Sequence, residues 1–370
     1  MKSLHFPLLT KTTQLFFSQN IFLLLLSSFI INSCNGNAVN PSEQLKDPRE
    51  MTWTADTIAY EGSMQTFLTS LWVFSPTDAW VAGHNERSLG EIYHFDGNNW
   101  TENEPMLRGV PISTKSINQI MGLTSNNLWM VGDRDSYPRK DLVLNWNGST
   151  WKEHILNIQL RPLRLFTNRA NDIWVGCDSA VVFRYNGTNW ERDKPKLNIP
   201  EGAEFFINGI IVKENLVYLN VTSYDIANRR YILFFLKGNF NNWSVLDSME
   251  IKDPQSVIKW GNWGIKLGND GGIYSFGDFG IWQYINNEWM HIIPINYTMH
   301  SIYAFKKNYK IAVGIFGMVW FFDGFTWQQL TNFFTPDGSN VLTDVWTNGK
   351  EIFILGHTTF PQKTIIWRGK

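Results

Sequence analysis

The sequence has few cysteines and few charges for its length. Its 370 residues include two cysteines, Cys34 and Cys177. Cys34 lies near the N-terminus, before the expected folded domain, so that domain contains only Cys177 and has no internal disulfide framework. We therefore expect the Cys177 thiol to be a small buried apolar group. The 32 basic and 33 acidic side chains give a formal net charge of −1. A nucleic-acid partner is therefore not expected, because phosphate binding needs a concentrated basic surface.

Motifs for catalysis, cofactors and metals are also missing. The sequence contains no G-x-S-x-G, no P-loop, no G-x-G-x-x-G, no C-x-x-C and no histidine pair at a ligand spacing such as H-x-x-x-H. We therefore predict no cofactor and no metal site, and we favour a binding role over an enzyme. The alternative is a carbohydrate-active hydrolase or lyase that uses acids near the mouth of a channel.

The first 33 residues predict export. Lys2 and Lys11 carry the only charges before an apolar run over residues 21–31, and these eleven residues are too few to span a bilayer. This order is typical of a secretory signal peptide over residues 1–33. Residues 34–50 are polar and lack an apolar period, so we expect a flexible tether there. The folded domain is expected over residues 51–370.

The segment Ile31-Asn32-Ser33-Cys34 resembles the lipobox of bacterial lipoproteins, in which the cysteine becomes the lipidated first residue. Asn32 departs from the small or aliphatic residue that is usual in this motif, so a soluble secreted product is the alternative. The resemblance implies that Cys34 is lipidated. It also implies a periplasmic or cell-surface location and contact with the membrane only through the lipid anchor.

One repeat fills the chain after residue 50. Segments that begin at Asp78, Asn127 and Asp172 each place tryptophan two residues later, end an apolar strand near glycine, and continue to an Asn/Asp-Gly turn before another tryptophan. The first-strand position recurs at steps of 43 to 49 residues, at Trp72, Met121, Phe166, Ile211, Trp260, Tyr303 and Trp346. Units of about four strands with this period predict an all-β propeller. The Asn/Asp-Gly turns predict type I′ hairpins.

The two chain ends indicate seven blades. The last repeat stops at Lys370 after three strands, and residues 51–54 look like a fourth strand. We expect this N-terminal strand to complete the last blade and close the ring. Six blades are the alternative, because residues 207–250 and 256–295 diverge most. Fourth strands begin with a recurring tryptophan, at Trp53, Trp100, Trp151, Trp190, Trp243, Trp289 and Trp327.

Seventeen of the eighteen tryptophans have a place in this repeat, and Trp263 is the exception. Recurring aromatic side chains are expected to pack between neighbouring blades rather than to bind sugars. The pattern D-x-W-x-x-G followed by (D/N)-G-x-x-W resembles the blade repeat of secreted bacterial β-propeller proteins, which are largely uncharacterised. The resemblance covers residues 51–370 and implies the fold without implying an activity. Sialidase-type, WD and kelch repeats fit the sequence less well.

Loop lengths predict which face of the propeller binds a ligand. Turns from first to second and from third to fourth strands are short, whereas second-to-third loops, such as 133–140, 222–230 and 357–363, and blade connections are long. Binding residues concentrate in variable loops on a rigid scaffold, so we expect a protein or glycan ligand there. Gln119 and Ser301 are expected to line the channel mouth. The candidate binding residues are Arg87, Asp133, Arg134, Asp135, Tyr137, Arg164, Tyr224, Arg229, Arg230, Asp344 and His357.

Overall fold

The structure is a computed structural model. It describes residues 44–370 except 88, 108–109, 112–113, 135–140, 157–158, 199–201 and 253–255. The expected signal peptide, Cys34, Asp135 and Tyr137 lie outside the described residues. Within the described part of the chain, no helix is both long and apolar enough to cross a membrane.

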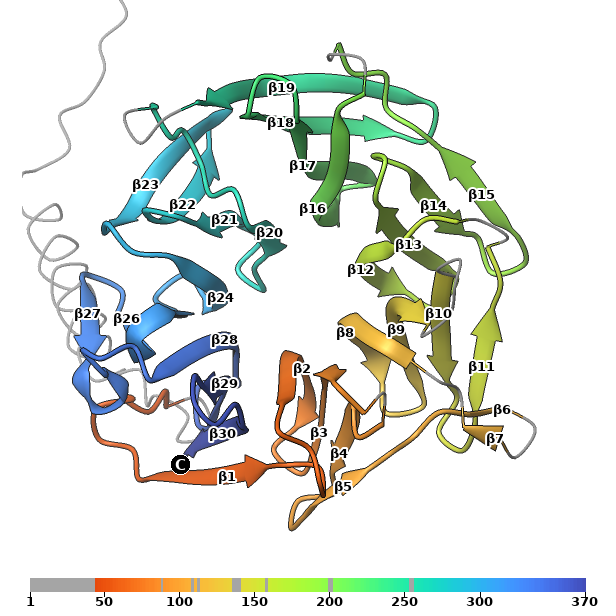
Figure 1. Ribbon diagram of the computed structural model, residues 1–370. Helices are drawn as coiled ribbons and strands as arrows, with labels where there is room; N and C mark the ends of the chain where they lie inside the picture. The colour runs from red at the N-terminus through yellow and green to blue at the C-terminus, as the bar shows by residue number, and fades with distance from the viewer. Residues whose placement is uncertain are drawn as a thin grey trace, which may run out of the picture. The chain divides into compact units, whose positions relative to one another are not determined.

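Lys46–Lys370 form one unit that contains seven four-stranded antiparallel sheets arranged as a ring (Figure 1). From the axis outwards, blade 1 contains β2 (Thr66–Ser75), β3 (Asp78–Asn85), β4 (Ile92–Phe95) and β5 (Trp100–Glu102). Blade 2 contains β8 (Thr114–Thr124), β9 (Asn127–Arg134), β10 (Asp141–Trp146) and β11 (Trp151–His154). Blade 3 contains β12 (Pro162–Arg169), β13 (Asp172–Cys177), β14 (Val182–Tyr185) and β15 (Trp190–Asp193).

Blade 4 contains β16 (Glu204–Lys213), β17 (Leu216–Asp225), β18 (Arg230–Asn239) and β19 (Asn242–Ile251). Blade 5 contains β20 (Gly264–Leu267), β21 (Ile273–Gly277), β22 (Gly280–Ile285) and β23 (Glu288–Pro294). Blade 6 contains β24 (Met299–Lys306), β25 (Tyr309–Gly314), β26 (Val319–Phe322) and β27 (Trp327–Leu330). Blade 7 contains β28 (Asn340–Thr347), β29 (Ile352–Thr358), β30 (Thr364–Gly369) and β1 (Trp53–Ile58). The predicted all-β propeller with seven blades is confirmed, and the six-blade alternative is wrong.

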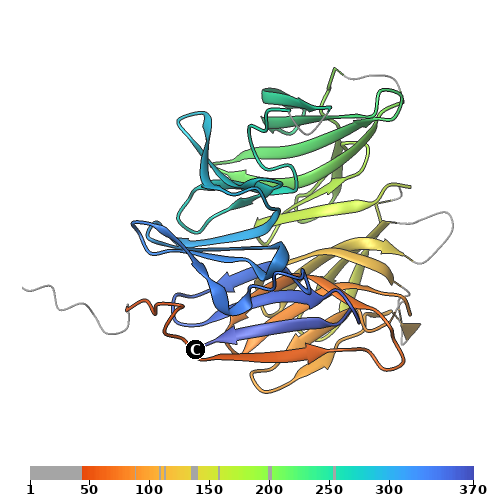
Figure 2. The same cartoon turned by 60° about the vertical axis from the view of Figure 1, so that its left-hand side comes forward.

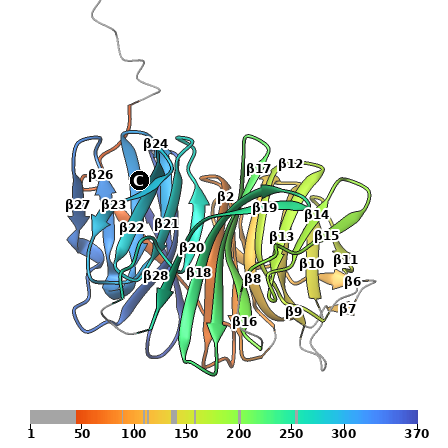
Figure 3. The same cartoon turned by 90° about the horizontal axis from the view of Figure 1, so that it is seen from above.

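A few short elements lie outside the blades. A small hairpin, β6 (Met106–Leu107) and β7 (Val110–Pro111), lies in the connection from blade 1 to blade 2. Two single-turn 3₁₀ helices belong to blade 6 and its exit, η3 (Ile315–Gly317) and η4 (Thr331–Phe333). Figure 3 shows the ring from its edge, with the blade strands running between two faces. We call these the short-turn face, with the first-to-second and third-to-fourth turns, and the long-loop face, with the second-to-third loops and blade connections.

The N-terminal strand closes the ring as predicted. β1 pairs antiparallel with β30, from Trp53 opposite Gly369 to Ile58 opposite Thr364. Figures 1 and 2 both show this orange strand beside the dark-blue strands of blade 7. The Trp53 ring meets the Phe333 ring edge-on, with the ring centroids 4.7 Å apart. Closure therefore pairs the edge that β30 would otherwise present to solvent.

The core lies between the blades, as the recurring aromatic residues predicted. Leu68 and Leu71 of blade 1 share a buried cluster with Phe353 and Leu355 of blade 7, and neighbouring blades form similar clusters around the ring. Second strands are covered on both sides, which is why β3, β9 and β13 are almost continuously buried. Cys177 is a free, buried thiol in this core, as expected. Burial raises its pKa far above the ordinary range.

A second repeated contact fastens the outer strands of adjacent blades. In four blades, the indole N–H of the terminal tryptophan donates to the side chain three residues after the terminal tryptophan of the preceding blade. The pairs are Trp100–Asp56 (3.2 Å), Trp151–Asn103 (3.0 Å), Trp190–His154 (3.4 Å) and Trp243–Asp193 (2.6 Å). The recurring terminal tryptophans therefore link adjacent blades by hydrogen bonds as well as by apolar packing.

The predicted type I′ turns are wrong for most third-to-fourth connections. Phe95 pairs with Trp100, so four residues rather than two form the turn, and the backbone N–H groups of Asn98 and Asn99 both donate to Oδ1 of Asp96 at 2.8 Å. These two bonds hold the pKa of the Asp96 carboxyl below its usual value. An acid or amide side chain that accepts two N–H groups stabilises the longer turn. Asn147, Asn186 and Asp323 repeat the arrangement.

The predicted first strand of blade 5 is misplaced. Trp260 precedes β20 and is fully buried. The ladder places Lys266 opposite Tyr274 as it places Trp72 opposite Trp80. Gly264 is the first residue of the true strand and Gly261 precedes it, and a Cβ at Gly261 would be 2.3 Å from the backbone of Phe276. These glycines weaken the apolar pattern, so the sequence alone assigned the wrong residue to the inner strand.

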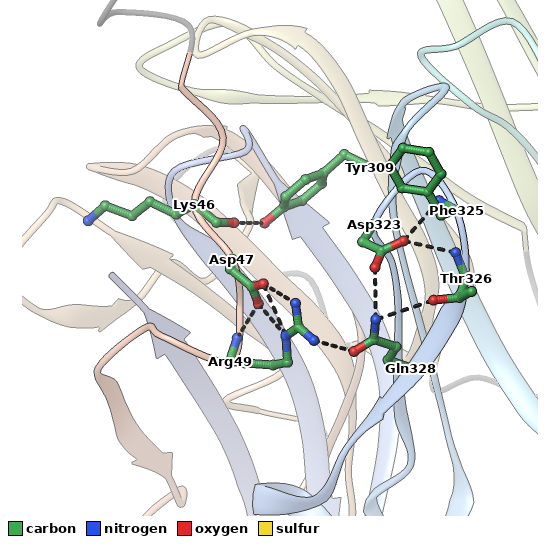
Figure 4. A network of polar contacts seen from close by, with 8 residues as sticks. All are labelled: Lys46, Asp47, Arg49, Tyr309, Asp323, Phe325, Thr326 and Gln328. Atoms are coloured by element: carbon green, nitrogen blue, oxygen red, sulfur yellow. Dashed lines mark hydrogen bonds and ion pairs between the residues drawn. The ribbon is translucent and has the colours of Figure 1, made fainter.

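The chain joins the propeller at the short-turn face. The N–H of Lys46 donates to the Gly349 carbonyl at 2.8 Å, and the Tyr309 hydroxyl donates to the Lys46 carbonyl at 2.9 Å (Figure 4). Arg49 is paired with Asp47 and donates to Gln328. Residues 46–50, which belong to the expected tether, therefore lie against blades 6 and 7.

Candidate functional site

A cavity of about 770 Å³ occupies the long-loop end of the central channel, and residues from all seven blades line it. Its walls include the starts of inner strands, as at Phe67, and the ends of second strands, as at His84 and His357. Because these strand ends lie at the long-loop face, the cavity opens among the long loops. Its volume is in the range of small-ligand pockets.

One repeat position forms a ring deep in this cavity. The ladders place seven residues at the same position, two before the residue equivalent to Trp72, namely Ser70, Gln119, Arg164, Gly209, Gly264, Ser301 and Asp344. We call this set the inner ring. Ser70, Gln119 and Asp344 also border a second cavity of about 300 Å³ at the short-turn end of the channel. The inner ring therefore lies where the two cavities meet.

Polar side chains of the inner ring join neighbouring blades. Ser70 Oγ accepts the N–H of Ile120 in blade 2 at 3.1 Å, and Gln119 Oε1 accepts that of Leu165 in blade 3 at 2.8 Å. Asp344 Oδ2 accepts the N–H of Leu71 in blade 1 at 3.2 Å. These bonds satisfy inner-strand donors that the axis leaves without a strand partner. Gln119 and Asp344 line the channel and also hold neighbouring blades together.

Two opposite charges in the cavity neutralise each other. Lys266 Nζ donates to Asp344 Oδ1 at 2.6 Å and to Ser301 Oγ at 2.7 Å, and Ser301 Oγ donates to the same carboxylate oxygen at 2.8 Å. Asp344 is 9% exposed, and both of its oxygens accept hydrogen bonds. A carboxylate engaged in this way is poorly placed for proton transfer with a substrate, so the geometry does not favour the catalytic alternative.

Arg164 has a different environment. Its Nε donates to the Asn208 carbonyl at 2.7 Å and its Nη1 to the Leu163 carbonyl at 2.9 Å. Among the described residues no carboxylate forms an ion pair with it, and the structure gives its Nη2 no partner there. The side chain is half-buried, and this burial lowers its pKa to about 10. The guanidinium is therefore still charged at neutral pH and faces the cavity without an acid.

Three histidines complete the polar lining. His300 Nδ1 lies 2.8 Å from the Leu342 carbonyl oxygen, and the His357 ring packs edge-on against Phe67 at 4.4 Å. Burial lowers the pKa of His300 and of His357, which keeps both rings neutral at pH 7. His84 is the third histidine of the lining, and the Asp, Glu, Lys and Arg side chains that line the described cavity are Arg164, Lys266 and Asp344. No group of three or more metal-binding side chains occurs among the residues that the structure describes.

The remaining candidates that the structure describes lie outside the cavity. Arg134 forms an ion pair with Glu153, and Arg87 donates to the Gly62 carbonyl at 2.6 Å. Asp133 is buried at the end of β9, with only 5% of its surface exposed. The cavity thus brings together three of the predicted residues, Arg164, Asp344 and His357.

The predicted loop 222–230 is shorter than expected. β17 and β18 stay paired up to Asp225 opposite Arg230, so Tyr224 belongs to a strand and its ring stacks on Tyr231 at 4.7 Å. Arg230 is held by Asp225 at 2.9 Å and also by Glu250. Arg229 alone of this group is an exposed turn residue. The cross-strand pairs Tyr224–Tyr231 and Asp225–Arg230 stabilise the hairpin past the apolar residues from which its strands were predicted.

Sequence reasoning missed two residues of the cavity. Lys266 was missed because the first strand of blade 5 was misplaced. Trp263 is 47% exposed, lines the cavity and lies 5.1 Å from His300 between ring centroids. Its signal was present in the sequence, since it was the one tryptophan without a repeat position. An aromatic residue that the scaffold does not require therefore lies at the candidate site.

Exposed apolar side chains gather on the same face. Of the fifteen exposed large hydrophobic residues in the described part of the chain, eleven lie in or beside long-loop segments. They are Met64, Met106, Ile155, Ile226, Tyr231, Val257, Trp263, Phe279, Tyr297, Phe334 and Phe360. Exposed apolar groups of this kind are typical of surfaces that bind other molecules.

Comparison with known proteins identifies the architecture. No protein-family model matches the chain, and no curated protein matches its sequence. A structure of YCF48 bound to D1 peptide has a TM-score of 0.56 and 13% identity, covering 88% of this chain and 97% of that chain. A structure of YCF48 from Cyanidioschyzon merolae has a TM-score of 0.54 and 14% identity, covering 84% and 98%. At these identities the likeness concerns the fold alone, and this chain is similar to both in its β-propeller architecture.

Proposed function

We propose that this chain is a binding module that takes up a segment of a partner protein at its long-loop face. The observation that carries the proposal is the cavity of about 770 Å³, which all seven blades line and which opens among the long loops. A rigid scaffold that presents a largely apolar cavity with a few charged side chains inside a rim of variable loops is suited to recognition.

The chemistry of the rim favours a protein partner over a glycan. Met64 is 85% exposed in the connection from β1 of blade 7 to β2 of blade 1. Phe360 is 95% exposed in the second-to-third loop of blade 7, between β29 and β30. Flexible aliphatic and aromatic groups of this kind are buried well by apolar side chains of another protein. Tyr224, one of the predicted binding residues and an aromatic ring that could stack on a sugar, already has a ring face covered by Tyr231. The YCF48 structure with a bound D1 peptide supports the proposal, since that protein shares the fold.

Selection of peptides tests this function. The full chain would be screened against a random peptide library, and the selected peptides would be measured by titration calorimetry. Thr69 lines the cavity, so Thr69→Trp should fill it and weaken binding at least about tenfold. Thr188→Trp adds the same side chain to an exposed short turn and should leave affinity unchanged. Failure to select any peptide, or equal affinity of the two variants, would refute the proposed site.

We also propose that the protein is exported and anchored by a lipid on Cys34. The support is the signal-like segment and the lipobox resemblance in the sequence. Lys46 joins the propeller at the Gly349 turn on the short-turn face, so a tether ending there would leave the long-loop face free for a partner. Cys34→Ser should move the protein from the membrane to the soluble fraction. Unchanged membrane association would exclude the lipid anchor.

A further inference from the structure

The central cavity contains a positive charge that no acidic side chain among the described residues neutralises. The charged residues of its described lining are Arg164, Lys266 and Asp344, and the last two are bonded to each other at 2.6 Å. The remaining positive charge belongs to Arg164, whose bonded acceptors are two backbone carbonyls, those of Asn208 and Leu163. Arg164 is half-buried, and withdrawing a cation from water without a counter-ion is unfavourable, so this arrangement suits a ligand that brings a negative charge.

The position of Arg164 suits a group at the end of a chain or side chain. Arg164 belongs to the inner ring, deep in the cavity, and Phe67, Trp263 and Phe276 form apolar parts of the surrounding wall. Nε and Nη1 fix the plane of the guanidinium through the carbonyls of Asn208 and Leu163. Nη2 has no partner among the described residues and is the donor left for an incoming acceptor. A hydrogen bond from a guanidinium to a carboxylate is stronger than one between neutral groups because both partners are charged.

We infer that the cavity recognises a carboxylate, which Arg164 binds while the aromatic wall contacts the apolar group next to it. This inference rests on the proposed function, because it names the chemistry of the partner segment that enters the cavity. The carboxylate is either the C-terminus of the segment or the side chain of an acidic residue. Lys266 does not compete for it, because Asp344 and Ser301 hold its ammonium.

A small probe separates the charge from the rest of the peptide. N-acetyl-phenylalanine carries one carboxylate beside an aromatic ring, and N-acetyl-phenylalaninamide has the same shape without the charge. Titration of the full chain, followed by NMR, should show binding of the acid in the millimolar range and binding of the amide at least about tenfold weaker. N-acetyl-aspartic acid α-amide, in which only the side-chain carboxylate is free, then distinguishes the two sources of the anion.

Variants assign the effect to Arg164. Arg164→Gln should remove the preference for the acid over the amide, and Arg164→Lys should keep part of it because the charge remains. Arg169→Gln makes the same change on β12, at an exposed position at the other end of this strand, and should leave binding unchanged. Thermal unfolding of each variant shows whether it folds. If Arg164→Gln unfolds, Arg164→Lys and the acid-to-amide comparison on the unaltered chain still decide the matter.

The outcomes separate this inference from the proposed function. An acid preference that depends on Arg164 supports the inference. Equal binding of acid and amide, an acid preference that survives in Arg164→Gln, or no binding of either probe would overturn it. The proposed function fails separately, if the peptide library yields no ligand for the cavity.

Discussion

The indole Nε1 of Trp243 in blade 4 donates a 2.6 Å hydrogen bond to Oδ2 of Asp193 in blade 3. The same oxygen accepts the backbone N–H of Asn241, also at 2.6 Å. One carboxylate therefore holds both the terminal tryptophan and the turn that precedes it. At three other blade junctions, the residue three positions after the terminal tryptophan also accepts the indole N–H of the next blade. The contact is therefore a repeated link between adjacent blades.

Asp193→Ala should lower the free energy of unfolding by about 2 kcal/mol, because it leaves an indole and a backbone donor without their acceptor. Asp193→Asn keeps an acceptor oxygen and should lose less than half as much. Urea unfolding followed by tryptophan fluorescence measures both. Equal stability of the alanine variant and the unaltered protein would show that the contact contributes nothing.

Asp344→Ala should be more destabilising, by about 3 kcal/mol or more, because it leaves the ammonium of Lys266 without its counter-ion and the N–H of Leu71 without its acceptor. Lys266→Met in the same chain should recover part of the loss, since the uncompensated charge is then gone. Unfolding of the two single variants and the double variant forms a complete cycle. Strictly additive losses would mean that the two side chains are not coupled.

Trp53→Ala should weaken closure of the ring and cost about 2 kcal/mol, because the half-buried indole packs edge-on against Phe333 beside the last strand. Phe325→Ala is the matched control, since this ring is 91% exposed in a short turn and should change stability by less than about 0.5 kcal/mol. Calorimetric unfolding compares the two. A loss in Phe325→Ala as large as that in Trp53→Ala would contradict the closing role.

Acid should destabilise the protein through His154. Burial, followed by the charge of Lys152, lowers the pKa of His154 from 6.5 to about 4. Between these values the unfolded chain binds the proton and the folded chain does not, so stability is complete above pH 6.5 and falls as the pH drops toward 4. His291, His300 and His357 have lowered pKa values from burial and act in the same direction.

His154→Gln should therefore reduce the slope of stability against pH in this window, by roughly 1 kcal/mol per pH unit at most. Urea unfolding at pH 7, 6, 5 and 4.5 measures the slope. At pH 7 the variant should lose stability, because it disturbs the contact with the Trp190 indole. An identical slope in both proteins would contradict the burial of a neutral His154 as a source of acid sensitivity.

Much of the fold could be predicted from local patterns. The tryptophans at steps of a blade and the Asp-Gly or Asn-Gly before them are local features, and each blade folds from its own stretch of chain. The orphan strand at Trp53 could be assigned to the last blade because the final repeat lacked a fourth strand. Where glycines interrupted the pattern, as at Gly261 and Gly264, the same reasoning placed Trp260 in the inner strand instead of Lys266.

The candidate site was less predictable. Arg164 and Asp344 could be placed near the channel mouth and His357 on the long-loop face from their repeat positions, but their roles could not be distinguished. Asp344 is bonded to Lys266, which is 78 residues away along the chain. Arg164 has no acid in reach among the described residues. Whether a charge is neutralised depends on which side chains closure brings together across the axis, and no local pattern carries that information.

The amino-acid sequence by itself determined the blade, the number of blades and the strand that closes the ring, because periodic apolar residues and turn residues act over a few neighbouring positions. Only the tertiary structure decided what the channel contains. Inner strands from all seven blades meet at the axis, so the pairing of Lys266 with Asp344, and the position of Arg164 away from every described acid, arise once the ring is closed. Electrostatic interactions depend on distance in space, and residues far apart in the chain become neighbours there.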